Sequence, residues 1–380
     1  MSYPVKWFDS TMGGAPVLSG TAGSMIALLD ACLINGFNVL TPTSITVSGG
    51  VATVVYPTAH GHLQHQVIAV SGATPAELNG EKRVLSVVDI NTLTFDATGI
   101  ADGTASGTIS TKAAPIGTWE KMFSGDNKAV YRCTDLTSTR LYLRVDDSNP
   151  NNALARGYES MADMDTGLGP FPTTAQSSTG YVWRKSDETP GAARRWRLFG
   201  DAFLFHVLVR WSWNSSYGAA WYQFGDGISY RSGDAYHCMI AGHETTSPSY
   251  PGASPYTAEC SASMGRLCMA RSYSQEGGSV VCRIIGSKSG ELGFGGPVYP
   301  SPVDGGLLLH HPVFITQGGV TDPVRGEMAG IMQPFQSGLP PDGTVIENIE
   351  GATGRVIMLV QIDWATSPGR IAIDMTGPWR

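Results

Sequence analysis

Three histidines lie close together in the segment AHGHLQHQ, and imidazole is a common ligand for transition metals. His60 and His62 are two residues apart, so on a strand both side chains would point to one face and could bind Zn or Fe, with His65 nearby. Gly61 and the preceding Pro57 instead favour a turn in which the histidines have no shared role. We favour the turn, predict no metal and no other cofactor, and keep His60, His62 and His65 as candidate ligands.

Four aspartates, Asp146, Asp147, Asp163 and Asp165, lie in or near segments that we expect to be loops. A glycosidase needs two carboxyl groups on either side of a cleft, and spacing alone does not identify such a pair. We therefore favour solvated turn residues. The chain contains no GxSxG, P-loop, HExxH or dinucleotide-binding motif, and we predict that it is not an enzyme.

The second half of the chain contains residues that could bind zinc: Cys238, His243, Cys260, Cys268 and Cys282. The CxxC spacing typical of zinc sites is absent, so the pattern is a weak indication of one. The first residues, MSYPVKWFDS, lack the basic and apolar segments of a signal peptide, and no apolar run is long enough to span a membrane. We expect all six cysteines to be reduced and buried.

Arg194, Arg195 and Arg197 flank Trp196, and such a cluster could hold phosphate or nucleic acid. The net charge of −7 argues against broad nucleic-acid binding, which requires a basic face. We favour a surface or interface charge patch and predict no nucleic-acid partner.

The most regular apolar pattern is FLFHVLVRWSW, residues 203–213. Read with period two, one face is apolar throughout and holds Phe203, Phe205, Val207, Val209, Trp211 and Trp213. The other face becomes more polar toward its end, which predicts a strand with one buried face and one that leaves the core. Residues 219–224 return as the partner of a hairpin. Stacking of Trp211, Trp213, Trp221 and Tyr222 on sugars is an alternative, but we favour packing in the core.

The elements that position these residues are mostly strands. A helix is expected in SGTAGSMIALLDACLINGF, with an apolar stripe from Met25 to Leu33, a start capped by Ser19, Thr21 or Ser24, and an end at Asn35-Gly36. Short strands with regular turns follow. We predict a mainly β fold: an arm and helix over 1–42, an inserted small β-sandwich or barrel over 43–112, and a β-sandwich-like main domain with long loops over 113–380.

Two long segments, 148–195 and 244–262, are rich in Gly, Pro and Ser, and we expect them to be mostly loop. They are poor in Lys and Glu but carry aromatics, a composition typical of interface cores. The two chain ends add further aromatic anchors. The candidate assembly contacts are Trp7, Phe8, Trp183, Trp196, Pro378, Trp379 and Arg380; the alternative is that the aromatics hold the loops to their own domain.

Three segments resemble structural proteins of tailed bacteriophages: WFDSTMGGAPVLSGTAGSMIALLDACLINGF (Trp7–Phe37), VIAVSGATPAELNGEKRVLSVVDINTLTFDATG (Val67–Gly99) and IAIDMTGPWR (Ile371–Arg380). The resemblance implies a virion component, assembled in the host cytoplasm and located in the tail or baseplate. It implies homo-oligomeric assembly and contacts with other virion proteins, and it supplies no active-site residues. The alternative is a tail protein that binds or cleaves glycans of the host surface.

Overall fold

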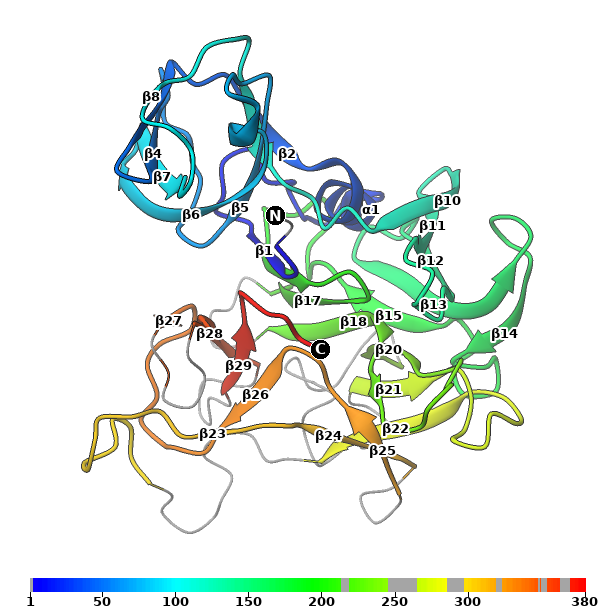
Figure 1. Cartoon of the computed structure of the whole chain (residues 1–380). Coiled ribbons are helices and arrows are strands. Elements are labelled where there is room, and N and C mark those ends of the chain that lie inside the picture. Colours follow the sequence, from blue (N-terminus) through cyan, green and yellow to red (C-terminus); the bar gives the residue numbers. More distant parts are fainter. Residues whose placement is uncertain are drawn as a thin grey trace.

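A computed structural model describes residues 3–212, 219–244, 265–285, 297–318, 323–347, 349, 354–362 and 370–380. Within them the chain forms three antiparallel sheets and one twelve-residue helix near the N-terminus, and part of the sheet structure curls into a half-barrel (Figure 1). The predicted mainly β fold with a single N-terminal helix is therefore confirmed. No described helix has the length and apolar character needed to cross a membrane.

The helix begins as α1 (Ser24–Leu29) and continues as a wider π-helical segment over Asp30–Asn35. Its buried side chains include Met25, Leu29 and Cys32, as the apolar stripe predicts. The predicted cap is wrong, because no side chain at the helix start caps it locally. Instead, the carboxylate of Asp147, which follows a strand of the largest sheet, accepts hydrogen bonds from the backbone N–H of Met25 at 2.7 Å and of Ile26 at 3.2 Å. A tertiary contact thus satisfies the free N–H groups of the first turn.

The largest sheet has sixteen strands, and it includes the predicted hairpin of β17 (Leu204–Arg210) and β18 (Ala220–Asp226), on a branch that joins the main strand order at β20. β16 (Arg195–Gly200) pairs with β17 on one side, and β20 (Cys238–His243) pairs with β18 on the other. The remaining strands of this sheet are β1 (Lys6–Asp9), β10 (Trp119–Gly125), β11 (Lys128–Cys133), β12 (Tyr142–Asp146), β13 (Asn152–Met161), β14 (Gly167–Phe171), β15 (Tyr181–Arg184), β19 (Ile228–Ser229), β21 (Gly265–Met269), β22 (Val280–Ile285), β24 (Phe314–Gln317) and β25 (Val324–Glu327).

β17 departs from the prediction, because both of its faces are buried from Leu204 to Val209. The face expected to leave the core is covered by the C-terminal part of the chain. His206 contacts the carbonyl oxygen of Ala329 through Nε2 at 3.0 Å, and its ring lies 5.5 Å from that of Trp379. A second layer on a sheet removes the alternation of exposure that an open face would keep. Trp213 lies outside the described residues.

Part of the segment expected to be loop is ordered sheet: β13, β14 and β15 all fall between 148 and 195. Small residues make this packing possible. A Cβ on Gly157 would come within 2.2 Å of the Phe171 ring, so glycine is required where β13 and β14 pair. Of the other long segment, 244–262, only residue 244 is among the described residues.

The second sheet forms a lobe that projects from the main body (Figure 1). Its eight strands are β2 (Phe37–Leu40), β3 (Ser44–Ser48), β4 (Val51–Val55), β5 (Val67–Ser71), β6 (Gly80–Asp89), β7 (Thr92–Asp96), β8 (Gly103–Thr104) and β9 (Ser110–Ala113). We call this lobe the module. It encloses a hydrophobic cluster of its own, which includes Val54, Leu93 and Phe95. The chain enters along β2 and leaves along β9, and these two strands pair with each other.

The third sheet is C-terminal and was not distinguished in the sequence. Its strands are β23 (Leu309–His310), β26 (Ile331–Pro334), β27 (Val345–Ile346), β28 (Ile357–Gln361) and β29 (Arg370–Asp374). Alternate residues of β28 serve two cores: Ile357 and Leu359 join a small cluster of this sheet, whereas Met358 and Val360 join the main core. The sheet therefore lies against the main sheet as a second layer.

Candidate functional site

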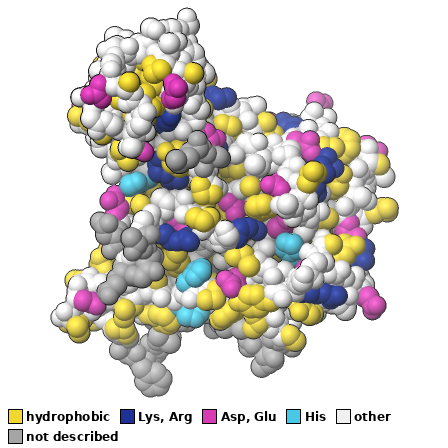
Figure 2. Space-filling view, viewed as in Figure 1, with side chains coloured by type: hydrophobic (Ala, Val, Ile, Leu, Met, Phe, Trp, Pro, Cys, Tyr) yellow, Lys and Arg dark blue, Asp and Glu magenta, His cyan; other side chains and the backbone are white. Residues whose placement is uncertain are grey.

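A groove of about 690 Å³ lies where the three sheets meet. Each sheet contributes to its walls: the module through the segment before β5, the main sheet through β1 and β16, and the C-terminal sheet through β27, β28 and the turn before β27. The lining residues are Trp7, Asp9, Leu63, Gln64, His65, Arg195, Arg197, Asp342, Gly343, Val345, Glu347 and Met358. Figure 2 shows basic, acidic and histidine side chains interspersed in the zone between the module and the lower sheets.

One wall is built by the alternation of β16. Arg195 and Arg197 are two residues apart and both line the groove, whereas Trp196 between them is buried in the main core. The indole N–H of Trp196 donates to the carbonyl oxygen of Pro16 at 3.0 Å. The neighbouring Arg194 is buried and pairs with Asp187 at 2.6 Å. The arginine cluster of the sequence is thus divided, and only Arg195 and Arg197 reach the groove.

Arg197 connects the main sheet with the C-terminal sheet. Its Nε donates to Asp9 Oδ2 at 2.8 Å, and its Nη1 donates to both carboxylate oxygens of Asp342 at 3.0 and 3.1 Å. Arg210 Nη2 lies 3.0 Å from Asp342 Oδ2. Burial by itself raises the pKa of Asp342, but the two guanidinium groups outweigh it and hold that pKa below its ordinary value. The carboxylate is therefore charged at neutral pH and fixes the turn before β27.

Two donor groups in the groove remain unused within the described chain. Arg195 is exposed and makes no ion pair or side-chain hydrogen bond there, and Nη2 of Arg197 has no hydrogen-bond partner. Gly343 makes room for this Nη2, because a Cβ at that position would lie 2.7 Å from it. Trp7 also lines the groove, but its indole N–H is buried, and no described residue accepts a hydrogen bond from it.

The opposite wall links the module to the C-terminal sheet. His65 Nε2 lies 2.8 Å from Glu347 Oε1, and Gln64 Nε2 lies 3.5 Å from the same oxygen. The Glu347 side chain is half-exposed, so this wall presents a carboxylate to any bound molecule.

The three candidate metal ligands do not converge. His60 and His62 are buried with their rings 5.6 Å apart, and the backbone N–H of His62 donates to His60 Nδ1 at 2.9 Å. His65 is directed instead toward Glu347. Burial, reinforced by His60, lowers the pKa of His62 to about 4, so it is neutral at physiological pH. Within the described residues, no group of three or more His, Cys, Asp or Glu side chains is placed to hold a metal ion.

The four candidate aspartates separate into two groups. Asp163 and Asp165 are exposed, as expected for turn residues. Arg144 forms ion pairs with both Asp146 and Asp165. Asp147 is different, because it is fully buried beside Lys185 and the helix start. Burial raises its pKa, and the Lys185 ammonium offsets this only in part. Its position indicates a structural role, so the prediction of a solvated turn residue is wrong for Asp147.

The described cysteines are free and buried, as predicted: Cys32, Cys133, Cys238, Cys268 and Cys282. Burial raises the pKa of Cys268 and of Cys282 to about 12, which keeps both thiols protonated and poor metal ligands. Cys260 lies outside the described residues.

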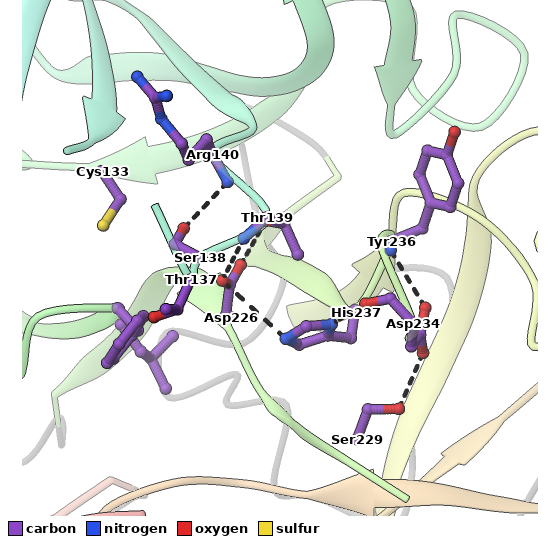
Figure 3. Close-up of polar contacts among 12 residues, drawn as sticks. Cys133, Thr137, Ser138, Thr139, Arg140, Asp226, Ser229, Asp234, Tyr236 and His237 are labelled. Carbon is purple, nitrogen blue, oxygen red and sulfur yellow. Dashed lines mark hydrogen bonds and ion pairs between the residues drawn. The ribbon is translucent and has the colours of Figure 1, made fainter. Parts of the chain in front are cut away.

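An aspartate and histidine cluster at the end of β18 could suggest hydrolytic chemistry (Figure 3). Asp226 Oδ2 accepts a hydrogen bond from the backbone N–H of Thr139 at 2.8 Å and lies 3.9 Å from His237 Nε2. The other ring nitrogen, Nδ1, donates to the carbonyl oxygen of Asp234. Ser229 donates to the Asp234 carboxylate at 2.8 Å rather than to the imidazole. None of the described hydroxyl groups hydrogen-bonds to the His237 ring, so these contacts tie the end of β18 to the neighbouring loops rather than pairing a nucleophile with a base.

The predicted assembly contacts are mostly inside the protein. Trp7, Phe8, Trp183 and Trp196 all belong to the main core, and Trp379 covers His206. The burial of these five aromatic side chains agrees with the alternative interpretation, in which they hold the loops and chain ends to their own domain. Only Pro378 and Arg380 are exposed, and Arg380 pairs with Asp201 at 3.0 Å.

No model of a known protein family matches the chain, and no curated protein sequence matches it. The groove must therefore be interpreted from its own geometry. The Arg-Trp-Arg alternation could have indicated which arginines share a face. Asp9, Asp342 and Glu347, which complete the site, carried no signal in the sequence.

Proposed function

We propose that the chain is a structural component of a tailed-bacteriophage virion, in the tail or baseplate, and that it acts by assembling with copies of itself and with neighbouring virion proteins. The resemblance of three segments to such proteins motivates the proposal. The observation that carries it is an apolar surface on the projecting module.

This surface lies on β6 and the turn after it. Leu85 is 45% exposed, Val87 39%, Val88 62% and Ile90 71%, whereas Val84 on the same strand is buried. Leu85 and Val88 have no partner residue on β7, because the register shifts twice along the pair. Such bulges adjust the direction of side chains on a strand. An exposed apolar row of this kind is typical of a surface that a partner covers.

Sedimentation velocity on the full-length chain tests the proposal directly. Wild type is expected to form a defined oligomer, and a Val88→Glu, Ile90→Glu variant is expected to shift toward monomer, because charge opposes burial of this surface. Leu136→Glu is the matched control, since Leu136 is 80% exposed but lies in the main domain. Its assembly should be unchanged.

Location is tested with an antibody against the chain on negatively stained particles of the phage that encodes it. Label on the tail or baseplate supports the proposal. A wild-type chain that stays monomeric at tens of micromolar and is absent from particles would contradict it.

A further inference from the structure

We propose that the groove between the three sheets is a binding site for a carboxylate-bearing saccharide. This inference goes beyond assembly and does not depend on it. It starts from the two guanidinium groups that the fold leaves with unused donors, Arg195 and Nη2 of Arg197.

The two arginines suit a carboxylate. They lie on one face of β16, about 7 Å apart along the strand, close enough for both to reach a single anionic group. Arg197 is held by Asp9 and Asp342, so its free Nη2 edge is fixed before a ligand arrives. Arg195 is exposed and can close on the same group. Guanidinium groups bind carboxylates through paired, charge-assisted hydrogen bonds.

The rest of the groove suits hydroxyl groups rather than further negative charge. Asp9, Asp342 and Glu347 line it, and all three would repel a dense polyanion or an acidic peptide. A saccharide carries one carboxylate per acidic residue and several hydroxyls. Those hydroxyls can donate to Glu347 and accept from Gln64, which lie on the wall opposite the two arginines.

Apolar side chains complete the site. Leu63, Val345 and Met358 come from the module and the C-terminal sheet and line the groove with the polar groups. They provide surface for the C–H face of a sugar ring, as in other sites that combine apolar walls with a few placed polar groups. The volume of about 690 Å³ accommodates a short oligosaccharide.

The test is calorimetric titration of the full-length chain with three probes: trigalacturonate, a glucuronate-containing trisaccharide and sialyllactose. Each is compared with its carboxyl-reduced neutral form. At least one acidic probe is expected to bind about tenfold or more tightly than its neutral form, the effect of one charge-assisted contact. An acidic peptide is titrated in parallel.

Two variants examine the site without removing a structural contact. Arg195→Gln should weaken binding of the acidic probe by about tenfold or more. Val345→Trp should fill the groove and abolish binding without changing a charge. Arg231→Gln, which removes the same charge outside the groove, should bind as wild type does, and thermal melting confirms that each variant folds.

Four results would overturn the proposal: no binding of any acidic probe at millimolar concentration, equal binding of the neutral forms, an equal loss in Arg231→Gln, or equally tight binding of the acidic peptide. None of them bears on assembly, which is measured separately by sedimentation.

Discussion

Asp147 beside the helix and Asp342 in the groove are both carboxylates buried against basic side chains, but their pKa values shift in opposite directions. Asp147 has one cationic partner, Lys185, and both side chains are fully buried. Asp342 has two, Arg197 and Arg210, and keeps a small exposed fraction. Burial dominates at Asp147 and raises its pKa, whereas the two guanidinium groups dominate at Asp342 and lower it.

The comparison shows that the number of cationic partners must be weighed against the completeness of burial. It also separates two roles. The Asp147 pair is sealed inside the protein and holds the helix to the β-domain. The Asp342 cluster borders the groove, and Arg197 is the arginine of the cluster that lines it.

The largest effect is expected from Lys185→Met. It leaves the Asp147 carboxylate buried without its cation, which should cost about 3–5 kcal/mol of unfolding free energy. Urea denaturation measures this cost. Adding Asp147→Asn should recover part of it, because the remaining group is neutral. A single variant that loses less than about 1 kcal/mol would show that the pair is not needed.

Asp342→Ala should have the next largest effect, a loss of about 1.5–3 kcal/mol, the range for hydrogen bonds to charged groups. The loss is smaller because Arg197 keeps Asp9, and because both arginines reach water. Urea denaturation again provides the measurement. Glu276→Ala, at an exposed turn, serves as the control, and a change in Asp342→Ala no larger than in this control would contradict the prediction.

The pH dependence of stability should differ in sign between the two sites. The pKa of Asp342 is lowered on folding, so its stabilising contribution is present above the pKa of the unfolded chain and is lost as pH falls through the folded value. The pKa of Asp147 is raised, so the folded state binds the proton more tightly and wild type gains from this site as pH falls through the raised value.

Unfolding free energies from pH 7 down to about pH 3, where unfolded carboxyls titrate, test this sign. The unfolding free energy of wild type minus that of Asp342→Asn should decrease as pH falls. The unfolding free energy of wild type minus that of Asp147→Asn should increase over the same range. Parallel pH profiles for the two variants would refute the assigned directions.

The smallest effect is expected from Glu347→Gln, which removes the carboxylate that contacts His65 Nε2. Because the Glu347 side chain is 45% exposed, the pair should contribute less than about 1 kcal/mol to stability. Thermal denaturation in low and high salt measures it. A loss comparable to that of Asp342→Ala would make this contact a principal link between the module and the C-terminal sheet.

Much of the fold could be predicted because it depends on local periodicity. The helix stripe from Met25 to Leu33 and the β17–β18 hairpin are patterns of neighbouring residues, and both are present in the structure. The third sheet was missed as a separate sheet: β28 and β29 are neighbours in the sequence, but the sheet that they join is decided by pairing with the more distant β26. The burial of His206 was missed for the same reason, because the residues that cover it lie more than a hundred positions away.

The sequence by itself determined the mainly β class, the position of the helix and the buried, reduced state of the described cysteines. These properties follow from side-chain period and composition, which act over a few residues. Only the tertiary structure decided that Trp7 and Trp196 are core residues, that His65 faces Glu347 rather than His60, and that Arg195 and Arg197 share a groove with Asp342. Such pairings depend on which distant strands lie side by side, and burial and charge are fixed only after those strands have packed.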